Sequence, residues 1–166
     1  MNLGGFVYKL GDSVNTDLII SGRYKFSITD MKQLSRHVFE DIDPDFYSKL
    51  KHGSSIIVAG ENFGMGSSRE QAPLVIKEAG IVAVVAKSFA RIFFRNAFNV
   101  GLPLIETDTS GINERDELEI DLEKGTLSDL TNKKQFEIKP LPKVMMRILN
   151  DGGLVAHFKK YGRIEL

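Results

Sequence analysis

The pattern of apolar and polar positions predicts three short buried strands in the middle of the chain. Residues 55–59, 81–86 and 102–105 are almost wholly apolar, and such runs are typical of strands that are covered on both faces of a sheet. Between them, residues 72–79 and 89–98 place apolar side chains at helical spacing. The alternation of strand and helix predicts a βαβ core with a parallel sheet.

The segment before this core has a weaker pattern. Residues 5–10 alternate weakly and end at a Gly-Asp turn, so we expect a strand there. Residues 12–28 follow no clear period, and we expect a long loop. Residues 31–38 have helical spacing, and Thr29 or Asp30 stands where a helix cap belongs.

The last third of the chain changes its pattern. Residues 118–122 and 135–138 alternate between polar and apolar, and a Glu-Lys-Gly turn follows the first of them. We therefore expect an antiparallel hairpin with one face in water. Residues 141–149 and 154–161 predict two short helices separated by a Gly-Gly pair, with His157 at the surface. The complete pattern predicts an α/β fold with a parallel core and an added antiparallel hairpin.

Composition narrows the class of protein. The 166 residues show no repeat and no linker, so we expect a single domain over residues 1–166. Lys plus Arg equals Asp plus Glu at 22 each, so no overall charge draws the chain to nucleic acid. The absence of cysteine excludes a disulfide scaffold, a thiol nucleophile and thiolate ligation of an iron–sulfur cluster by this chain. The three histidines stand far apart in the sequence, so we expect no metal site.

The sequence also bears on location. The N-terminus has no basic segment followed by an apolar stretch, which a secretory signal would need. The longest apolar run, residues 81–86, is far shorter than the ~20 residues that span a bilayer. We expect a cytoplasmic protein that contacts neither a membrane nor nucleic acid.

The sharpest chemical pattern is the segment 60–70, Gly-Glu-Asn-Phe-Gly-Met-Gly-Ser-Ser-Arg-Glu, between a buried strand and a helix. Ligands bind at the carboxyl ends of strands in open α/β sheets, and the free N–H groups of a helix start favour an anion. Arg69 can grip a carboxylate through two parallel hydrogen bonds. An alternative stays open, in which Ser67 or Ser68 caps the helix, Glu70 completes a capping box and Arg69 is only solvated.

Three segments resemble the small swivelling domain of the aconitase superfamily. They are the loop at 60–70, the stretch from residue 86 to 103 that begins Ala-Lys-Ser-Phe-Ala-Arg-Ile, and residues 11–20, Gly-Asp-Ser-Val-Asn-Thr-Asp-Leu-Ile-Ile. The chain is most similar to the short form of the 3-isopropylmalate dehydratase small subunits, and the homoaconitase small subunits are similar too. The resemblance implies a mixed β/β/α swivelling domain.

The resemblance also implies a function. Members of the family are subunits of hydro-lyases that move a hydroxyl between neighbouring carbons of a small hydroxy acid, and the resemblance implies a role for this chain in leucine biosynthesis. Their [4Fe–4S] cluster lies on a separate large subunit, so we expect that subunit as the partner and no cofactor on this chain. A homoaconitase or methyl-malate-type dehydratase subunit is the alternative, and a stand-alone anion-binding module is a further one. The isolated chain could form a homo-oligomer.

The resemblance assigns roles to individual residues. The family's serine base falls on Ser67, a substrate-binding serine on Ser68, and the carboxylate-binding arginine on Arg69. A further substrate-binding arginine falls on Arg23, whose alternative is a plain surface residue. The loop that sets the pocket for the variable group of the substrate consists of Tyr24, Lys25, Phe26 and Ser27.

Other polar residues have structural expectations. We expect Ser88 to cap the helix at 89–98. We expect side-chain to backbone hydrogen bonds within the loop from Asp12, Asn15, Thr16 and Asp17. Three residues at helical spacing are expected to pin their helix or face the partner subunit rather than touch substrate, namely Arg91, Arg95 and Asn96.

Overall fold

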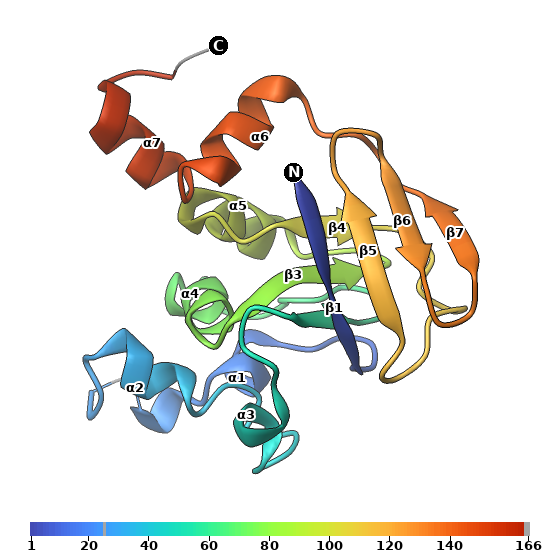
Figure 1. The fold of residues 1–166 in the computed structure, drawn as a ribbon. Helices are drawn as coiled ribbons and strands as arrows, with labels where there is room; N and C mark the ends of the chain where they lie inside the picture. The colour runs from blue at the N-terminus through green and yellow to red at the C-terminus, as the bar shows by residue number, and fades with distance from the viewer. Residues whose placement is uncertain (25, 165–166) are drawn as a thin grey trace.

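The computed structural model describes residues 1–24 and 26–164, and its elements surround one seven-stranded sheet (Figure 1). The strands are β1 (Asn2–Lys9), β2 (Ser55–Val58), β3 (Ile81–Ala86), β4 (Leu104–Glu106), β5 (Glu117–Asp121), β6 (Thr126–Asp129) and β7 (Lys134–Glu137). The helices are α1 (Thr16–Ile19), α2 (Met31–Ser35), α3 (Phe46–Lys49), α4 (Gln71–Glu78), α5 (Arg91–Val100), α6 (Lys143–Asn150) and α7 (Leu154–Tyr161), with a 3-10 turn, η1, at Gly22–Tyr24.

The sheet joins a parallel half to an antiparallel half. Its strand order is β4-β3-β2-β1-β5-β6-β7. Strands β1 to β4 run parallel to one another, whereas β5 pairs antiparallel with β1 and begins a meander through β6 and β7. The α/β class, the parallel core and the antiparallel addition expected from the sequence are therefore confirmed.

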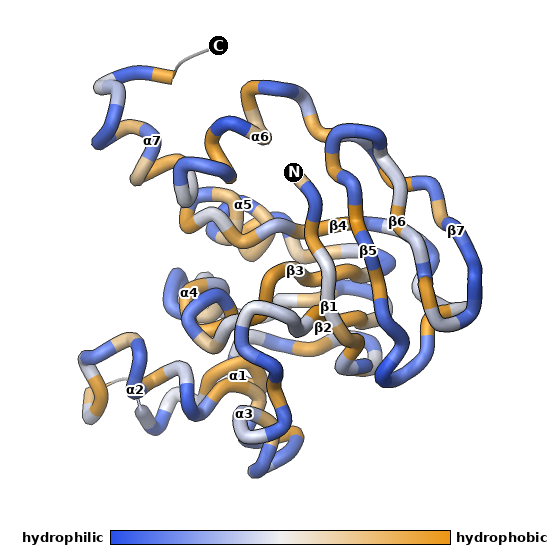
Figure 2. The backbone as a smooth tube through the Cα atoms, viewed as in Figure 1, coloured by the Kyte–Doolittle hydropathy of each residue, from blue (hydrophilic) through white to orange (hydrophobic). Residues whose placement is uncertain are grey.

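Two apolar cores lie on opposite faces of the parallel strands. Side chains alternate along β2, so that Ile57 belongs to the first core and Ile56 and Val58 to the second. Helices α1 to α5 contribute to the first core, and strands β5 and β6 help to enclose the second. The parallel strands read as continuous apolar runs because both of their faces are buried. In Figure 2 the outer strand β7 is, by contrast, largely hydrophilic.

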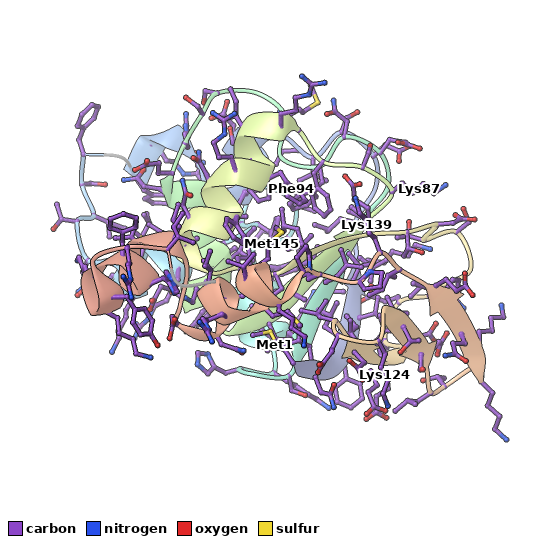
Figure 3. The ribbon with its side chains drawn as sticks, turned by 90° about the horizontal axis from the view of Figure 1, so that it is seen from above. Met1, Lys87, Phe94, Lys124, Lys139 and Met145 are labelled. Atoms are coloured by element: carbon purple, nitrogen blue, oxygen red, sulfur yellow. The ribbon has the colours of Figure 1, made fainter. Side chains whose placement is uncertain are left out.

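The last two helices lie against α5. Phe94 of α5 and Met145 of α6 lie between those two helices (Figure 3), and both line the same small gap. His157 of α7 is fully buried, and its Nδ1 lies 2.7 Å from a carboxylate oxygen of Asp151. The expectation of a surface histidine is wrong, since the carboxylate lets the ring remain polar inside the protein.

The structure corrects two element predictions and confirms one cap. The expected loop at 12–28 contains α1, whose cap Asn15 accepts a hydrogen bond from the N–H of Leu18, and the turn η1. The expected hairpin is a three-stranded meander, because β6 stands between the two predicted strands. Asp30 caps α2 as predicted by accepting a hydrogen bond from the N–H of Gln33 at 3.1 Å.

Candidate functional site

The loop at residues 60–70 follows β2 at the carboxyl ends of the parallel strands and is held on two sides. Gly64 donates its N–H to the carbonyl of Val14 at 2.7 Å, and Ala90 donates its N–H to the carbonyl of Phe63 at 2.9 Å. The loop therefore joins the segment before α1 to the start of α5. These are the three segments that carry the family resemblance, and the fold places them side by side.

Gly64 makes this close packing possible. Its φ angle is +82°, in the left-handed region that favours glycine, and a Cβ at this position would lie 2.2 Å from Cγ of Phe93. The backbone of the loop thus rests directly on the ring of Phe93 at the base of α5. Any side chain at position 64 would push the loop away from α5.

The hydroxyls of Ser67 and Ser68 are not used to build the loop. The N-cap of α4 is Glu70, and it makes no side-chain capping bond, so the capping-box alternative is wrong. It is the carbonyl of Ser67 that holds the loop, by accepting hydrogen bonds from Thr16 Oγ1 at 3.0 Å and from the N–H of Arg69 at 2.9 Å. Within the described part of the chain neither serine hydroxyl has a hydrogen-bond partner, and both residues are exposed.

A depression of about 330 Å³ opens beside the two serines. This volume lies in the range of about 300–1,000 Å³ that ligand sites occupy. Thr16 and the serines line one side of it, and α5 lines the other with Arg91, Ile92 and Asn96. The depression therefore presents hydroxyl, guanidinium, amide and aliphatic groups to a ligand.

The start of α5 adds positive potential to this depression. Its N-cap is Ala90, which makes no side-chain capping bond. Ser88, the predicted cap, instead donates to the Glu61 carboxylate at 2.8 Å and accepts from the N–H of Asn62 at 2.7 Å, so that prediction is wrong. The first N–H groups of a helix have no partner within it, and together with the helix dipole they favour negative charge nearby.

Arg69 lies outside the lining of the depression and contacts α1 and η1 instead. Its Nη2 lies 2.5 Å from the Asp17 carboxylate, and its Nη1 donates to the carbonyl of Ile20 at 3.1 Å. Gly22 leaves room for the guanidinium, because a Cβ there would lie 3.1 Å from Nη2. A guanidinium has five N–H donors, so donors remain for a ligand. Asp17, expected to bond to backbone, forms this ion pair.

Arg23 and Tyr24 form a cluster with the turn that follows α2. Arg23 Nη2 lies 2.9 Å from Asp41 Oδ1 and 3.5 Å from Glu40 Oε1. The Tyr24 hydroxyl donates to Glu40 at 2.9 Å, and His37 Nδ1 contacts the same carboxylate while its ring stacks on Tyr24. Burial acts to raise the pKa of Glu40, but the hydrogen bonds from His37 and Tyr24 outweigh it and hold that pKa below its ordinary value.

The remaining residues of the predicted specificity loop do not line the depression. The side chain of Phe26 is 89% exposed, and Ser27 donates its hydroxyl to the carbonyl of Tyr24 at 3.5 Å. Lys25 lies outside the described residues. The structure therefore gathers the sequence-predicted residues into two groups, with Ser67 and Ser68 in the depression and the others, as far as they are described, outside its lining.

Sequence reasoning misses Arg91 and Asn96 as residues of the depression. Their spacing along the chain shows only which of them share a helix face, and it says nothing about what that face meets. The structure separates Arg91, which lines the depression, from Arg95, which does not. The distinction arises because the hydrogen bond from Ala90 to Phe63 places the loop at residues 60–70, the serine loop, at the first turn of α5.

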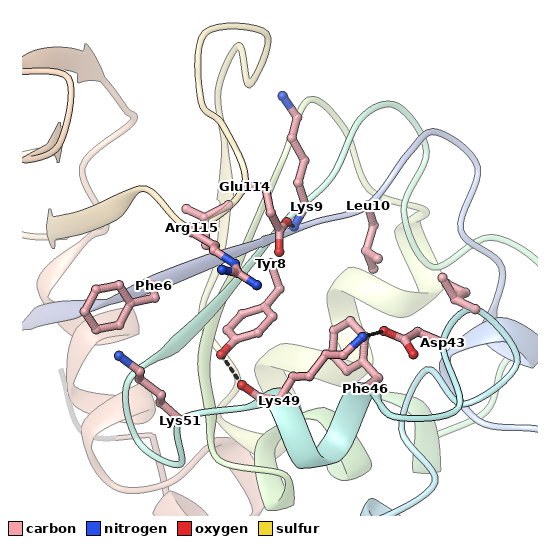
Figure 4. A pocket seen from close by; sticks show the side chains of 12 residues that line it. Phe6, Tyr8, Lys9, Leu10, Asp43, Phe46, Lys49, Lys51, Glu114 and Arg115 are labelled. Atoms are coloured by element: carbon pink, nitrogen blue, oxygen red, sulfur yellow. Dashed lines mark hydrogen bonds and ion pairs between the residues drawn. The ribbon is translucent and has the colours of Figure 1, made fainter.

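A larger pocket of about 710 Å³ lies beside β1 and α3, and Figure 4 shows it from close by. Phe6, Tyr8 and Phe46 form apolar walls. Several of its polar groups pair with one another, since the Tyr8 hydroxyl donates to the carbonyl of Lys49 and Lys49 Nζ lies 2.5 Å from Asp43. It holds none of the residues of the serine loop, so its volume does not make it the candidate site.

The described residues limit the chemistry of the site. In residues 1–24 and 26–164 no group of three or more histidine, cysteine, aspartate or glutamate side chains is placed to hold a metal ion. The same part of the chain contains no helix that is both long and apolar enough to cross a membrane. The depression is suited to binding an anion and moving a proton.

Comparisons with known proteins point to the same segments. Residues 13–109 match the family model described as the aconitase C-terminal domain. The 3-isopropylmalate dehydratase small subunit 2 of Archaeoglobus fulgidus is 52% identical over 166 residues and covers 100% of both chains. Small subunit 1 of Thermotoga maritima is 52% identical over 159 residues, 95% of each chain. The crystal structure of 3-isopropylmalate dehydratase from Methanocaldococcus jannaschii matches with a TM-score of 0.91 at 46% identity, covering 98% of this chain and 96% of that one.

Proposed function

Because the chain belongs to the aconitase C-terminal domain family, we propose that it is the small subunit of a 3-isopropylmalate dehydratase that works with a separate large subunit. In this role it takes part in the interconversion of 2- and 3-isopropylmalate by dehydration and rehydration. The observation that carries the proposal is the pair of exposed hydroxyls of Ser67 and Ser68 in a depression, neither of which is bonded to another described residue. The chain that presents them is about half identical over its full length to such subunits.

We assign the proton transfer to Ser67. Dehydration requires that one carbon next to a carboxylate lose a proton while the neighbouring carbon loses its hydroxyl. The Ser67 hydroxyl is exposed to the depression, and its backbone is fixed through the bond from Thr16. A serine alkoxide needs stabilisation, which the free N–H groups at the start of α5 supply as fixed positive potential.

Ser68 and Arg69 are assigned to substrate binding. Ser68 shares the depression with Ser67 and has a free hydroxyl to donate to a substrate oxygen. The guanidinium of Arg69 is anchored by Asp17 and the carbonyl of Ile20, which fixes its plane while leaving donors for a carboxylate. We therefore assign to Arg69 the carboxylate that is common to all substrates of the family.

Arg23 and the loop of Tyr24, Lys25, Phe26 and Ser27 are assigned to the variable group of the substrate. Loops carry variable recognition on a fixed scaffold, and the exposed ring of Phe26 suits an apolar branch. Arg23 is held by Asp41 and Glu40, with 54% of its side chain exposed. To contact substrate, Arg23 must therefore bind it alongside the carboxylates of Asp41 and Glu40 or release one of them.

The iron–sulfur cluster belongs to the partner in this proposal. The chain has no cysteine, and its described residues offer no set of metal ligands. On the large subunit a [4Fe–4S] cluster would supply the Lewis acid that accepts the leaving hydroxyl. The residues of this chain then bind carboxylates and move a proton.

Reconstitution with the large subunit tests the proposal. The purified chain, the purified large subunit and their mixture are assayed for interconversion of 2- and 3-isopropylmalate, with homoaconitate as a second substrate. We expect turnover of isopropylmalate in the mixture alone. Turnover of homoaconitate without isopropylmalate would move the function to the alternative enzyme. Turnover by the isolated chain, or stoichiometric iron and sulfide in it, would contradict the division of roles between the subunits.

A further inference from the structure

Among the residues that the structure describes, Arg91 is the one charged side chain that lines the depression beside Ser67 and Ser68. The other lining residues in the described chain are neutral hydroxyl, amide, glycine, alanine, isoleucine and phenylalanine residues. A malate-type substrate brings two carboxylates to the site, and burying a carboxylate without a counter-charge is costly. A cation within the depression, in addition to Arg69 outside its lining, would meet that need.

The guanidinium of Arg91 is also available. Arg69 and Arg23 both have carboxylate partners, Asp17 for the first and Asp41 for the second. Arg91 is exposed, and within residues 1–24 and 26–164 it makes no ion pair and no side-chain hydrogen bond. An arginine that is free of partners and borders two free hydroxyls matches the donors that carboxylate recognition uses.

We propose that Arg91 binds a second carboxylate of the hydroxy-acid substrate, with the amide of Asn96 as an additional donor on the same helix. This inference rests on the proposed function and deepens it. The carboxylate assigned to Arg69 is held from the side of α1, and the second one is held from the side of α5. The reacting carbons would then lie between the two arginines, beside Ser67.

The rest of the depression fits a branched acid. The side chain of Ile92 is 52% exposed although it is aliphatic, and it lies next to Arg91 at the rim. An isopropyl group placed against Ile92 would remove apolar surface from water on both sides. A substrate with a further carboxylate at that point would find no second counter-charge, because Arg91 is the one charged residue among the described residues that line the depression. The wall of α5 would therefore add to the selection assigned to the loop of residues 23–27 and favour isopropylmalate over homoaconitate.

The competing role for Arg91 is attachment to the large subunit, and the experiment separates the two. Arg91→Gln and Arg91→Lys are compared with wild type in the reconstituted complex. Arg95→Gln is the matched control, because it removes the same charge four residues along α5 from an exposed residue that does not line the depression. The assay measures KM and kcat for 3-isopropylmalate at saturating large subunit, and a titration of large subunit measures assembly.

We expect Arg91→Gln to raise KM about 10- to 100-fold, the scale of a lost hydrogen bond to a charged group. Arg91→Lys should recover part of the loss, since it restores the charge without the planar fork. Arg95→Gln should change KM by less than about twofold, as is usual for surface substitutions, and assembly should be unchanged in all three.

An unchanged KM in Arg91→Gln overturns the inference. Weakened assembly with a normal KM at saturation also overturns it, and makes Arg91 a residue that docks the large subunit. Failure of the proposed function gives a different result, because the wild-type complex itself would then reject isopropylmalate. If that complex turns over another hydroxydicarboxylate, the same variants assayed with that acid still decide the role of Arg91.

Discussion

The serine loop and the junction between α6 and α7 use polar side chains in opposite ways. In the loop, the hydroxyls of Ser67 and Ser68 are exposed and make no hydrogen bond to residues 1–24 or 26–164. At the junction, the ring of His157 is fully buried on Asp151, and Asp151 also accepts from Lys160 at 2.8 Å. Buried polar groups must be bonded, whereas exposed ones need not be. The contrast separates groups that hold the fold from groups that remain free for a ligand.

The largest effect on stability is expected for His157→Leu. Leaving a buried polar group without its hydrogen bond costs about 1–3 kcal/mol, and Asp151 keeps its bond to Lys160 in the variant. Denaturant unfolding measures the loss, and the kcat of the assembled complex below the unfolding transition should stay near the wild-type value. Lys159→Ala, an exposed change on the same helix, is the control. A wild-type unfolding free energy in His157→Leu would contradict the claim that this buried pair holds the fold.

The next largest effect is expected for Arg69→Lys, which should lower activity rather than stability. Lysine keeps the charge but cannot make a bidentate contact, and a hydrogen bond to a charged group is worth about 1.5–3 kcal/mol. We expect kcat/KM to fall by a factor that corresponds to this free energy, and to fall equally for isopropylmalate and homoaconitate. A fall confined to one substrate would contradict the assignment of Arg69 to the common carboxylate.

The order of elements in the parallel core could be predicted because burial on both faces leaves a readable signature. Strands β2 and β3 are continuous apolar runs for that reason. Strand β6, Thr-Leu-Ser-Asp, was missed because it presents a single large apolar side chain, Leu127, to the core. Local polarity could not reveal that strands on both sides would pair with it.

The site could be predicted only where its residues are adjacent in the sequence. Ser67, Ser68 and Arg69 stand in one motif, so the motif located them together. Arg91 joins them through a contact between distant segments, the bond from Ala90 to Phe63. Side-chain direction was equally hidden, since neighbouring residues 68 and 69 face different surroundings, the depression for Ser68 and Asp17 for Arg69.

A smaller effect is expected in the specificity loop. Phe26→Ala and Lys25→Ala should each change the ratio of kcat/KM between isopropylmalate and homoaconitate. The change for Phe26→Ala should be small, because apolar contacts distinguish substrates by only about 1–3 kcal/mol. Ser27→Ala, which removes a bond to the carbonyl of Tyr24, controls for loop distortion. Equal losses on both substrates would show that the loop does not select the variable group.

The loss of stability at low pH should depend on the junction between α6 and α7 rather than on the serine loop. Hydrogen bonds from Lys160 and then His157 hold the pKa of Asp151 below its ordinary value. Its stabilising contribution is therefore present above about pH 4 and is lost as the pH falls through the lowered pKa. Asp151→Asn should flatten the dependence of the unfolding free energy on pH between about 2 and 5. An identical slope in the variant would remove Asp151 from this account.

The most direct test of the central claim is the kcat of Ser67→Ala in the complex at saturating large subunit. A positioned base contributes about 10²–10⁴-fold to the rate, so we predict a fall of that size. The exposed hydroxyl bonds to no other described residue, so the free energy of unfolding should stay within about 0.5 kcal/mol of wild type, and assembly should be unchanged. A variant that folds, assembles and keeps a kcat near the wild-type value would contradict the account.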